Sequence, residues 1–144
     1  MAVMGIVHYG DPILRKKCAS VKDFSNLDSL IDDLYDTMYE AEGIGLAANQ
    51  TGLDLNLFVI DISHTDEKEK PRIFINCEII VSEGQSVFPE GCLSIPEITL
   101  DVTRPEFITC KYQGLDKEWQ EEEFSDLLGR AIQHEMDHLN GILK

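Results

Sequence analysis

Long apolar runs and basic residues are both scarce in this sequence of 144 residues. No apolar segment approaches the roughly 18 residues that a membrane-spanning helix needs, and the opening MAVMGIVHYGD lacks the basic region of a signal peptide. Lys and Arg number 12 against 27 Asp and Glu, which gives a net charge of −15 and no supply of basic residues for a phosphate backbone. We therefore expect a soluble cytoplasmic protein with no membrane segment and no direct nucleic-acid binding.

The cysteines lack the close spacing of a zinc ribbon or a dense disulfide framework. No C-x-x-C motif occurs, so reduced thiols are expected. Three of the thiols should be small buried hydrophobes: Cys18, Cys77 and Cys110. Cys92 differs because it lies in PEGCLSIPE, after Gly91 and between Pro89 and Pro96. We expect a tight irregular segment there that presents the thiolate at a fixed angle.

The periodicity of apolar residues predicts an α+β fold. Residues 26–42 have the helical spacing of an amphipathic helix, and residues 43–52 suit a short strand. Further strands are predicted from β-branched and aromatic content at residues 55–62, 72–81, 99–104, 106–113 and 118–124. Ser125 should then cap a C-terminal helix. This order predicts mainly antiparallel sheets packed around a C-terminal metal-binding helix, with an N-terminal amphipathic helix, in a single catalytic domain spanning residues 1–144.

The most informative stretch is QHEMDHLNG at residues 133–141. Residues four apart lie on one face of a helix, so His134 and His138 can offer two imidazole nitrogens to one metal ion. Glu135 lies beside them, where a carboxylate serves as the general base of H-E-x-x-H hydrolases. The competing interpretation is a polar stripe facing water. Burial is favoured instead by apolar residues at helical spacing: Leu127, Leu128, Ala131, Ile132 and Leu139.

The third metal ligand must come from upstream. A metzincin site would keep Gly141 and add a third histidine, but Lys144 occupies that position and the sequence ends there. The upstream candidates are the four cysteines, His8, His64 and many carboxylates.

Three motifs together resemble the peptide deformylase family. They are GIGLAANQ at residues 43–50, EGCLS at residues 90–94 and QHEMDHLNG at residues 133–141, in the order that the family has them. The opening DPILR and the overall spacing extend the resemblance over nearly the whole chain. The resemblance implies a metal-dependent hydrolase that removes the formyl group from the N-terminal formyl-methionine of new polypeptides and releases formate.

Carried over position by position, the resemblance implies that Cys92, His134 and His138 bind one divalent metal ion and leave one place for water. In the cell Fe²⁺ is the expected ion, and Zn²⁺, Ni²⁺ or Co²⁺ suit the same ligands. Glu135 would take a proton from the water. Gln50 and the backbone N–H of Leu93 would stabilise the oxyanion, although Gln50 could instead only cap a strand end.

The resemblance also implies a substrate site in which an extended peptide pairs with the edge of the first motif. The expected substrate-binding residues are Gly43, Ile44, Gly45, Glu90, Gly91, Leu127 and Ala131. Ile44, Leu93, Leu127 and Ala131 would surround the methionine side chain, but core packing is an alternative role for Leu127. Glu90 and Asp137 could orient histidine rings, and an ion pair with Arg104 is the competing role for Asp137.

N-formylated nascent peptides are the expected partners. Members of the family commonly continue beyond the H-E-x-D-H helix, whereas only six residues follow His138 here, so the sequence does not support a ribosome contact through a basic C-terminal helix. Two other functions are compatible with part of the pattern. A small metallopeptidase would share the water chemistry, and a non-catalytic metal-stabilised module would need a fourth protein ligand.

Overall fold

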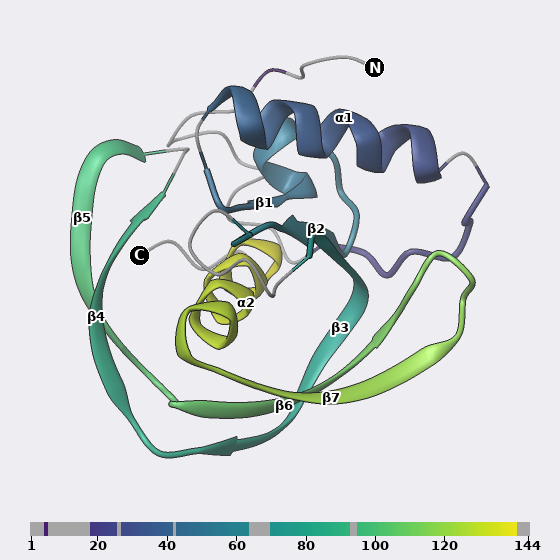
Figure 1. Cartoon of the computed structure of the whole chain (residues 1–144). Coiled ribbons are helices and arrows are strands. Elements are labelled where there is room, and N and C mark those ends of the chain that lie inside the picture. Colours follow the sequence, from purple (N-terminus) through teal and green to yellow (C-terminus); the bar gives the residue numbers. More distant parts are fainter. Residues whose placement is uncertain are drawn as a thin grey trace.

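The structure is a computed structural model that describes residues 5, 18–25, 27–41, 43–63, 70–92 and 95–140, without the side chains of residues 88–101. His8, His64, Leu93 and the DPILR segment lie outside the described residues. The elements are α1 (Leu27–Glu40), β1 (Gly45–Ala47), the 3₁₀ helix η2 (Ala48–Thr51), β2 (Leu57–Ile60), β3 (Arg72–Glu83), β4 (Ser86–Cys92), β5 (Ile95–Arg104), β6 (Phe107–Gln113), β7 (Trp119–Ser125) and α2 (Asp126–Leu139) (Figure 1).

A five-stranded antiparallel sheet separates the two α-helices of the described chain. Its strand order is β1-β2-β3-β6-β7. Because alternate side chains of a strand point to opposite faces, Leu57 and Val59 of β2 pack in the cluster below α1, whereas Phe58 and Ile60 pack in the cluster around α2. The predicted α+β class, with antiparallel sheets around the C-terminal helix, is confirmed (Figure 1).

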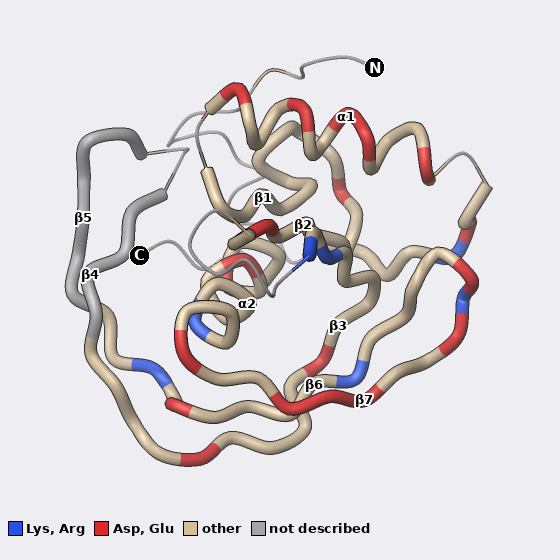
Figure 2. The backbone as a smooth tube through the Cα atoms, viewed as in Figure 1, with Lys and Arg blue, Asp and Glu red and all other residues tan. Residues whose placement is uncertain are grey.

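Helix α1 confirms the amphipathic helix that the apolar spacing predicts. Its buried apolar residues are Leu27, Ile31, Leu34 and Met38. Its carboxylates, Asp28, Asp32, Asp33, Asp36 and Glu40, are exposed or half-buried, and Figure 2 shows further carboxylates along β7. Most of this charge therefore faces water, where it costs little. Neither described helix is long and apolar enough to cross a membrane.

Two local predictions need correction. Residues 43–52 form a strand only at Gly45–Ala47 and then turn into η2, because the side-chain oxygen of Gln50 accepts a hydrogen bond from the N–H of Ala47 and competes with strand pairing. Ser125 does occupy the N-cap position of α2, but its side chain makes no cap hydrogen bond in the described structure. Instead, Asp126 has φ 55° and turns the chain directly from β7 into the helix.

The irregular segment expected around Cys92 is instead a β-hairpin, so that prediction is wrong. Strand β4 runs to Cys92 and pairs with β5 from Ser86↔Arg104 onwards, with a register shift between Gly91 and Cys92. Proline is tolerated at the edges of sheets, and both strands of a two-stranded sheet are edges. The prolines and Gly91 therefore occur in a strand, although they led to the prediction of an irregular segment. The register shift, which is typical of a β-bulge, lies at the end of this strand, next to Cys92.

A corner joins this hairpin to the larger sheet. The last pair of β3 and β6 is Glu83↔Phe107, and the first pair of β4 and β5 is Ser86↔Arg104. Between them, Gly84 has φ 73° and a Cβ placed on it would lie 3.2 Å from Cβ of Glu106. The two long strands therefore bend together, and the hairpin passes along one side of α2 (Figure 1).

We predict that Gly84→Ala lowers the free energy of unfolding by about 1 to 2 kcal/mol, because an L-residue is strained at this positive φ. Urea unfolding should show a lower midpoint at an unchanged m-value. Gly5→Ala is the control, since a Cβ there meets nothing within 4 Å. Equal stability of Gly84→Ala and Gly5→Ala would show that the corner does not need the left-handed conformation.

Candidate metal centre

Helix α2 brings His134 and His138 together. The Nε2 atoms of the two rings lie 3.2 Å apart, and the ring centroids lie 4.9 Å apart. This approach follows from the four-residue spacing on one helical face. Two imidazole nitrogens thus converge on one point, as ligands of a single ion do.

Burial keeps His138 in the form that binds metal. Only 3% of its surface is exposed, and this burial lowers the pKa of His138 to about 3, with smaller contributions in the same direction from His134 and Arg104. Metal ligation requires a neutral imidazole with a lone pair on nitrogen. His138 is therefore already deprotonated at neutral pH.

Glu135 lies next to the histidine pair and against the first sequence motif. Its side chain is 5% exposed. A Cβ placed on Gly45 would lie 2.7 Å from Oε2 of Glu135, so only a glycine leaves room for the carboxylate in its present position. The structure thus brings together two motifs that are separated by 90 positions in sequence, on β1 and α2.

Gln50 is buried at the other end of the first motif, with 1% of its surface exposed. Its Oε1 accepts a hydrogen bond of 3.1 Å from the N–H of Ala47. This bond fixes the amide orientation and makes Nε2 its donor end. The competing role of Gln50, as a cap of the strand end, is therefore present in the structure.

Asn49 is a residue that the sequence analysis missed. It is fully buried, and its Nδ2 donates a hydrogen bond to the backbone oxygen of His138. Helix η2 is thereby tied to the turn of α2 that carries the second histidine. Only its place inside the GIGLAANQ motif could have indicated this role.

The remaining residues of the first motif lie around β1. The N–H of Gly43 donates to the backbone oxygen of Met38, and the backbone oxygen of Ile44 accepts from the N–H of Asp61. The Ile44 side chain is partly buried against the core cluster that contains Ala131. Gly43 therefore closes the end of α1, and Ile44 reaches toward α2.

The structure describes the backbone position of Cys92 but not its side chain. Cys92 ends β4, while the side chain of Glu90 also lies outside the description, and Gly91 is defined only by its pairing with Thr99. The other cysteines are confirmed as buried core residues, at 5% exposure or less: Cys18, Cys77 and Cys110. A hydrogen bond to Cys110 and burial raise the pKa of the Cys77 thiol, which keeps it protonated.

Asp137 forms an ion pair with Arg104 of β5. Nη1 of Arg104 donates to Oδ2 of Asp137 over 2.7 Å, and the Arg104 side chain is only 6% exposed. The competing role for Asp137 is thus confirmed, although the pair is more buried than a surface ion pair. It attaches the helix of the two histidines to the hairpin of Cys92.

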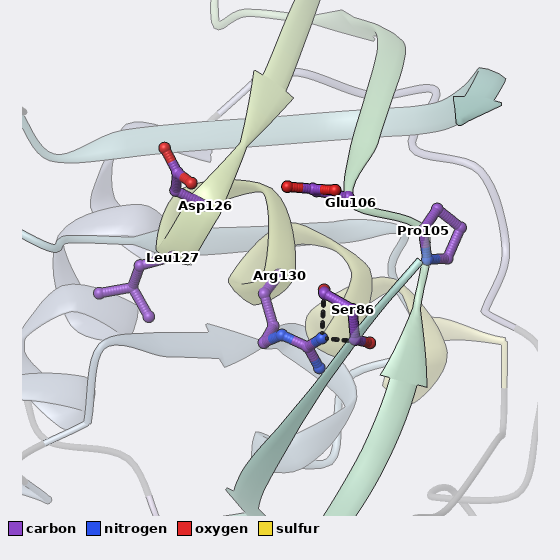
Figure 3. A pocket seen from close by; sticks show the side chains of 6 residues that line it. All are labelled: Ser86, Pro105, Glu106, Asp126, Leu127 and Arg130. Carbon is purple, nitrogen blue, oxygen red and sulfur yellow. Dashed lines mark hydrogen bonds between the residues drawn. The ribbon is translucent and has the colours of Figure 1, made fainter. Parts of the chain in front are cut away.

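Leu127 lines a pocket of about 320 Å³ between the start of α2 and the corner. The other lining residues are Ser86, Pro105, Glu106, Asp126 and Arg130 (Figure 3). Leu127 also packs against the core cluster, so core packing accounts for part of its role. Ala131, one turn further along α2, is buried in that cluster.

The donor set fits a divalent transition-metal ion. Two converging imidazoles, at least one of them held neutral, suit Fe²⁺, Zn²⁺, Ni²⁺ or Co²⁺. Within the residues whose side chains are described, no group of three or more His, Cys, Asp or Glu residues converges on one point.

An H-E-x-x-H helix held against antiparallel sheets, with its glutamate buried beside the histidines, defines a metal-dependent hydrolase. The family model for polypeptide deformylase matches residues 3–144. The chain therefore belongs to the polypeptide deformylase family.

Curated relatives and solved structures agree with this assignment. The peptide deformylase of Acidobacterium capsulatum is 46% identical over 144 residues, which cover 99% of this chain and 85% of the relative. The crystal structure of peptide deformylase from Thermotoga maritima has a TM-score of 0.94 and 40% identity, and the match covers 99% of this chain and 95% of that one. For the peptide deformylase from Synechococcus elongatus in complex with actinonin, the TM-score is 0.92 and the identity 42%, covering 97% of this chain and 77% of that one.

We predict that Gly45→Ala lowers kcat about 100-fold or more while metal content and folding persist, because the added methyl group displaces the flexible carboxylate of Glu135 rather than the backbone. Steady-state kinetics, metal analysis and thermal melting on one sample provide the measurement. In a Glu135→Gln background the same change should cost little more. Additive losses in the double variant would show that Gly45 acts on something other than Glu135.

Proposed function

We propose that the buried His134–His138 pair is the centre of the site with which this chain, as a member of the peptide deformylase family, removes the N-formyl group of newly made polypeptides. The chain is a metal-dependent hydrolase by its family. The observation that carries the site assignment is the 3.2 Å separation of the two Nε2 atoms on a buried helix, with Glu135 beside them. Formate and a free N-terminus are the products.

Cys92 is the third ligand in this proposal, and one metal ion is held by His134, His138 and Cys92. Three protein ligands leave an open position, as catalytic sites require. When bound, the ion activates a water molecule and polarises the formyl oxygen. Fe²⁺ is the proposed ion in the cell, and Zn²⁺, Ni²⁺ and Co²⁺ are compatible with the same ligands.

Glu135 moves the proton in the proposed mechanism. Its carboxylate accepts a proton from the attacking water and delivers it to the nitrogen of the departing amine. The position of Gly45 supports this role, because even a Cβ on that residue would occupy the space of the Glu135 carboxylate. Transfer of this kind typically contributes about 10²- to 10⁴-fold in rate.

Gln50 and the backbone N–H of Leu93 stabilise the oxyanion that forms on the formyl oxygen. The hydrogen bond between Ala47 N–H and Oε1 supports this role for Gln50, because it orients the amide with Nε2 as the donor end. Such donors act mainly in the transition state, where the charge develops.

The substrate lies along β1 in this proposal. Strand β1 is at the end of the sheet order, so an extended peptide can add to its outer edge. Gly43, Gly45, Glu90 and Gly91 border the peptide. The methionine side chain packs among a further set of proposed contacts: Ile44, Leu93, Leu127 and Ala131. Half-burial of Ile44 and Leu127 supports their part in this set.

N-formylated nascent peptides are the partners of the reaction, and we place it in the cytoplasm, where such peptides are made. The whole of residues 1–144 is proposed to act as one catalytic domain, in keeping with the span of the family match. A ribosome contact has no support among the described residues.

The direct test is an assay of anaerobically purified protein on formyl-Met peptides, with metal analysis of the same sample. Formate release in proportion to bound metal is expected. A matched acetyl-Met peptide should be cleaved far more slowly, and an internally cleavable peptide should remain intact. Cleavage of the internally cleavable peptide, without formate release from the formyl-Met peptide, would identify a metallopeptidase instead.

We predict that Cys92→Ala abolishes tight metal binding, because two imidazoles alone hold the ion weakly. Metal content after gel filtration provides the measurement. The control variants are Cys18→Ala, Cys77→Ala and Cys110→Ala, which should keep the metal since these thiols are buried in the core. Stoichiometric metal in Cys92→Ala would refute the ligand assignment.

Gln50→Glu and Gln50→Ala separate the two roles of Gln50. A glutamate can still accept the hydrogen bond from Ala47, but it cannot donate from Nε2 and its charge repels an oxyanion. We predict that both variants lose about 10²- to 10³-fold in kcat, with Gln50→Glu the worse of the two and a smaller effect on KM. If Gln50→Ala kept its kcat and only had a lower melting temperature, Gln50 would be a cap of the strand end and not an oxyanion donor.

A further inference from the structure

Arg130 connects α2 to both strands of the β4–β5 hairpin. Its Nη2 donates to the backbone oxygen of Ser86 over 2.9 Å and to Oγ of Ser86 over 2.7 Å, and its Nη1 donates to the backbone oxygen of Val102 over 3.1 Å. Figure 3 shows the guanidinium extending from α2 to Ser86 beside the corner. The planar fork of arginine suits two acceptors on neighbouring strands, which a single ammonium group cannot span equally.

The bonds of Arg130 meet the hairpin at its base. Ser86 is paired with Arg104, the residue that forms the ion pair with Asp137 of α2. Gln133 of α2 donates to the backbone oxygen of Pro105 over 3.0 Å, in the adjacent corner. Arg130, Gln133 and Asp137 share one side of the helix by their spacing of three and four residues.

The same turns of α2 carry the histidines. His134 and His138 follow Arg130 by one and two helical turns. Strands β4 and β5 pair only with each other among the described strands, and they form a sheet separate from the five-stranded one. The orientation of the hairpin relative to α2 therefore depends on the corner and on the α2 side chains that bond to the base of the hairpin.

The hairpin acts as a lever between Arg130 and Cys92. Cys92 lies six residues beyond Ser86 along β4, which is about 20 Å at roughly 3.3 Å per residue. A rotation of roughly 5° about the base would move the end of the strand by almost 2 Å, whereas metal ligands tolerate about 0.2 Å. A small rotation of the hairpin at Ser86 would thus be enough to displace Cys92 from the position that a metal ligand needs.

We propose that Arg130 is a positioning residue for the metal centre: by holding both strands of the hairpin to α2, it fixes the distance between Cys92 and the histidine pair and so raises metal affinity. This inference rests on the proposed ligand set. It assigns Arg130 no contact with the metal or the substrate. A merely structural Arg130 would affect the melting temperature but not the metal affinity of the folded protein.

The test is a Co²⁺ titration of the metal-free full chain against a competing chelator, with the absorption of the cobalt–thiolate bond recorded at saturation. The variants are Arg130→Lys, which keeps the positive charge in the pocket that Glu106 and Asp126 also line, and Arg130→Met, which keeps most of the apolar stem. We expect both to bind Co²⁺ about 10- to 100-fold more weakly and to show reduced cobalt–thiolate absorption. Ser86→Ala removes the shortest bond only and should weaken binding about threefold.

Arg72→Lys is the matched control, because Arg72 pairs with Glu122 of β7 at 3.3 Å and lies on the five-stranded sheet. It should keep the affinity of the unmodified chain. Unchanged affinity and absorption in Arg130→Lys, Arg130→Met and Ser86→Ala would overturn the proposal, whatever happens to their melting temperatures. Cys92→Ala in the same titration identifies failure of the ligand set: if it binds Co²⁺ as tightly as the unmodified chain, the assignment of Cys92 is wrong and the role of Arg130 falls with it.

Discussion

Burial of α2 against the sheets is the constraint on which the site depends. It takes His138 and Glu135 out of water, and for the imidazole of His138 this burial opposes the charged form. The imidazole responds with a pKa lowered to about 3, which leaves it neutral and able to bind a metal ion. The same exclusion of water strengthens every electrostatic interaction with a reacting group.

The corner at Gly84 and Pro105 explains how a simple antiparallel topology surrounds one helix. Without the bend, β4 and β5 would extend away from α2 as a continuation of β3 and β6. With it, the hairpin passes beside the helix, and bonds from Arg130, Gln133 and Asp137 hold it there. The corner and these side chains thus determine whether the EGCLS motif of the hairpin can lie near the QHEMDHLNG motif of α2.

Local patterns in the sequence predicted what depends on neighbouring residues. The spacing of His134 and His138, the amphipathic α1 and the α+β order are confirmed because helical periodicity decides them. The hairpin at Cys92 was not predicted because proline and glycine normally indicate a break, and only the edge position of β4 and β5 in a two-stranded sheet allows them there. Asn49 and Arg130 could not be found in this way, since their partners lie 89 and 44 positions away along the chain.

The central claim is that one thiolate joins the two histidines around a single ion. X-ray absorption at the zinc edge of the zinc-loaded, active protein measures this set of ligands directly. One sulfur at about 2.3 Å and nitrogen scatterers at about 2.0 to 2.1 Å, with the multiple scattering of two imidazoles, are expected. A spectrum fitted by nitrogen and oxygen alone, with no sulfur scatterer, would contradict the account.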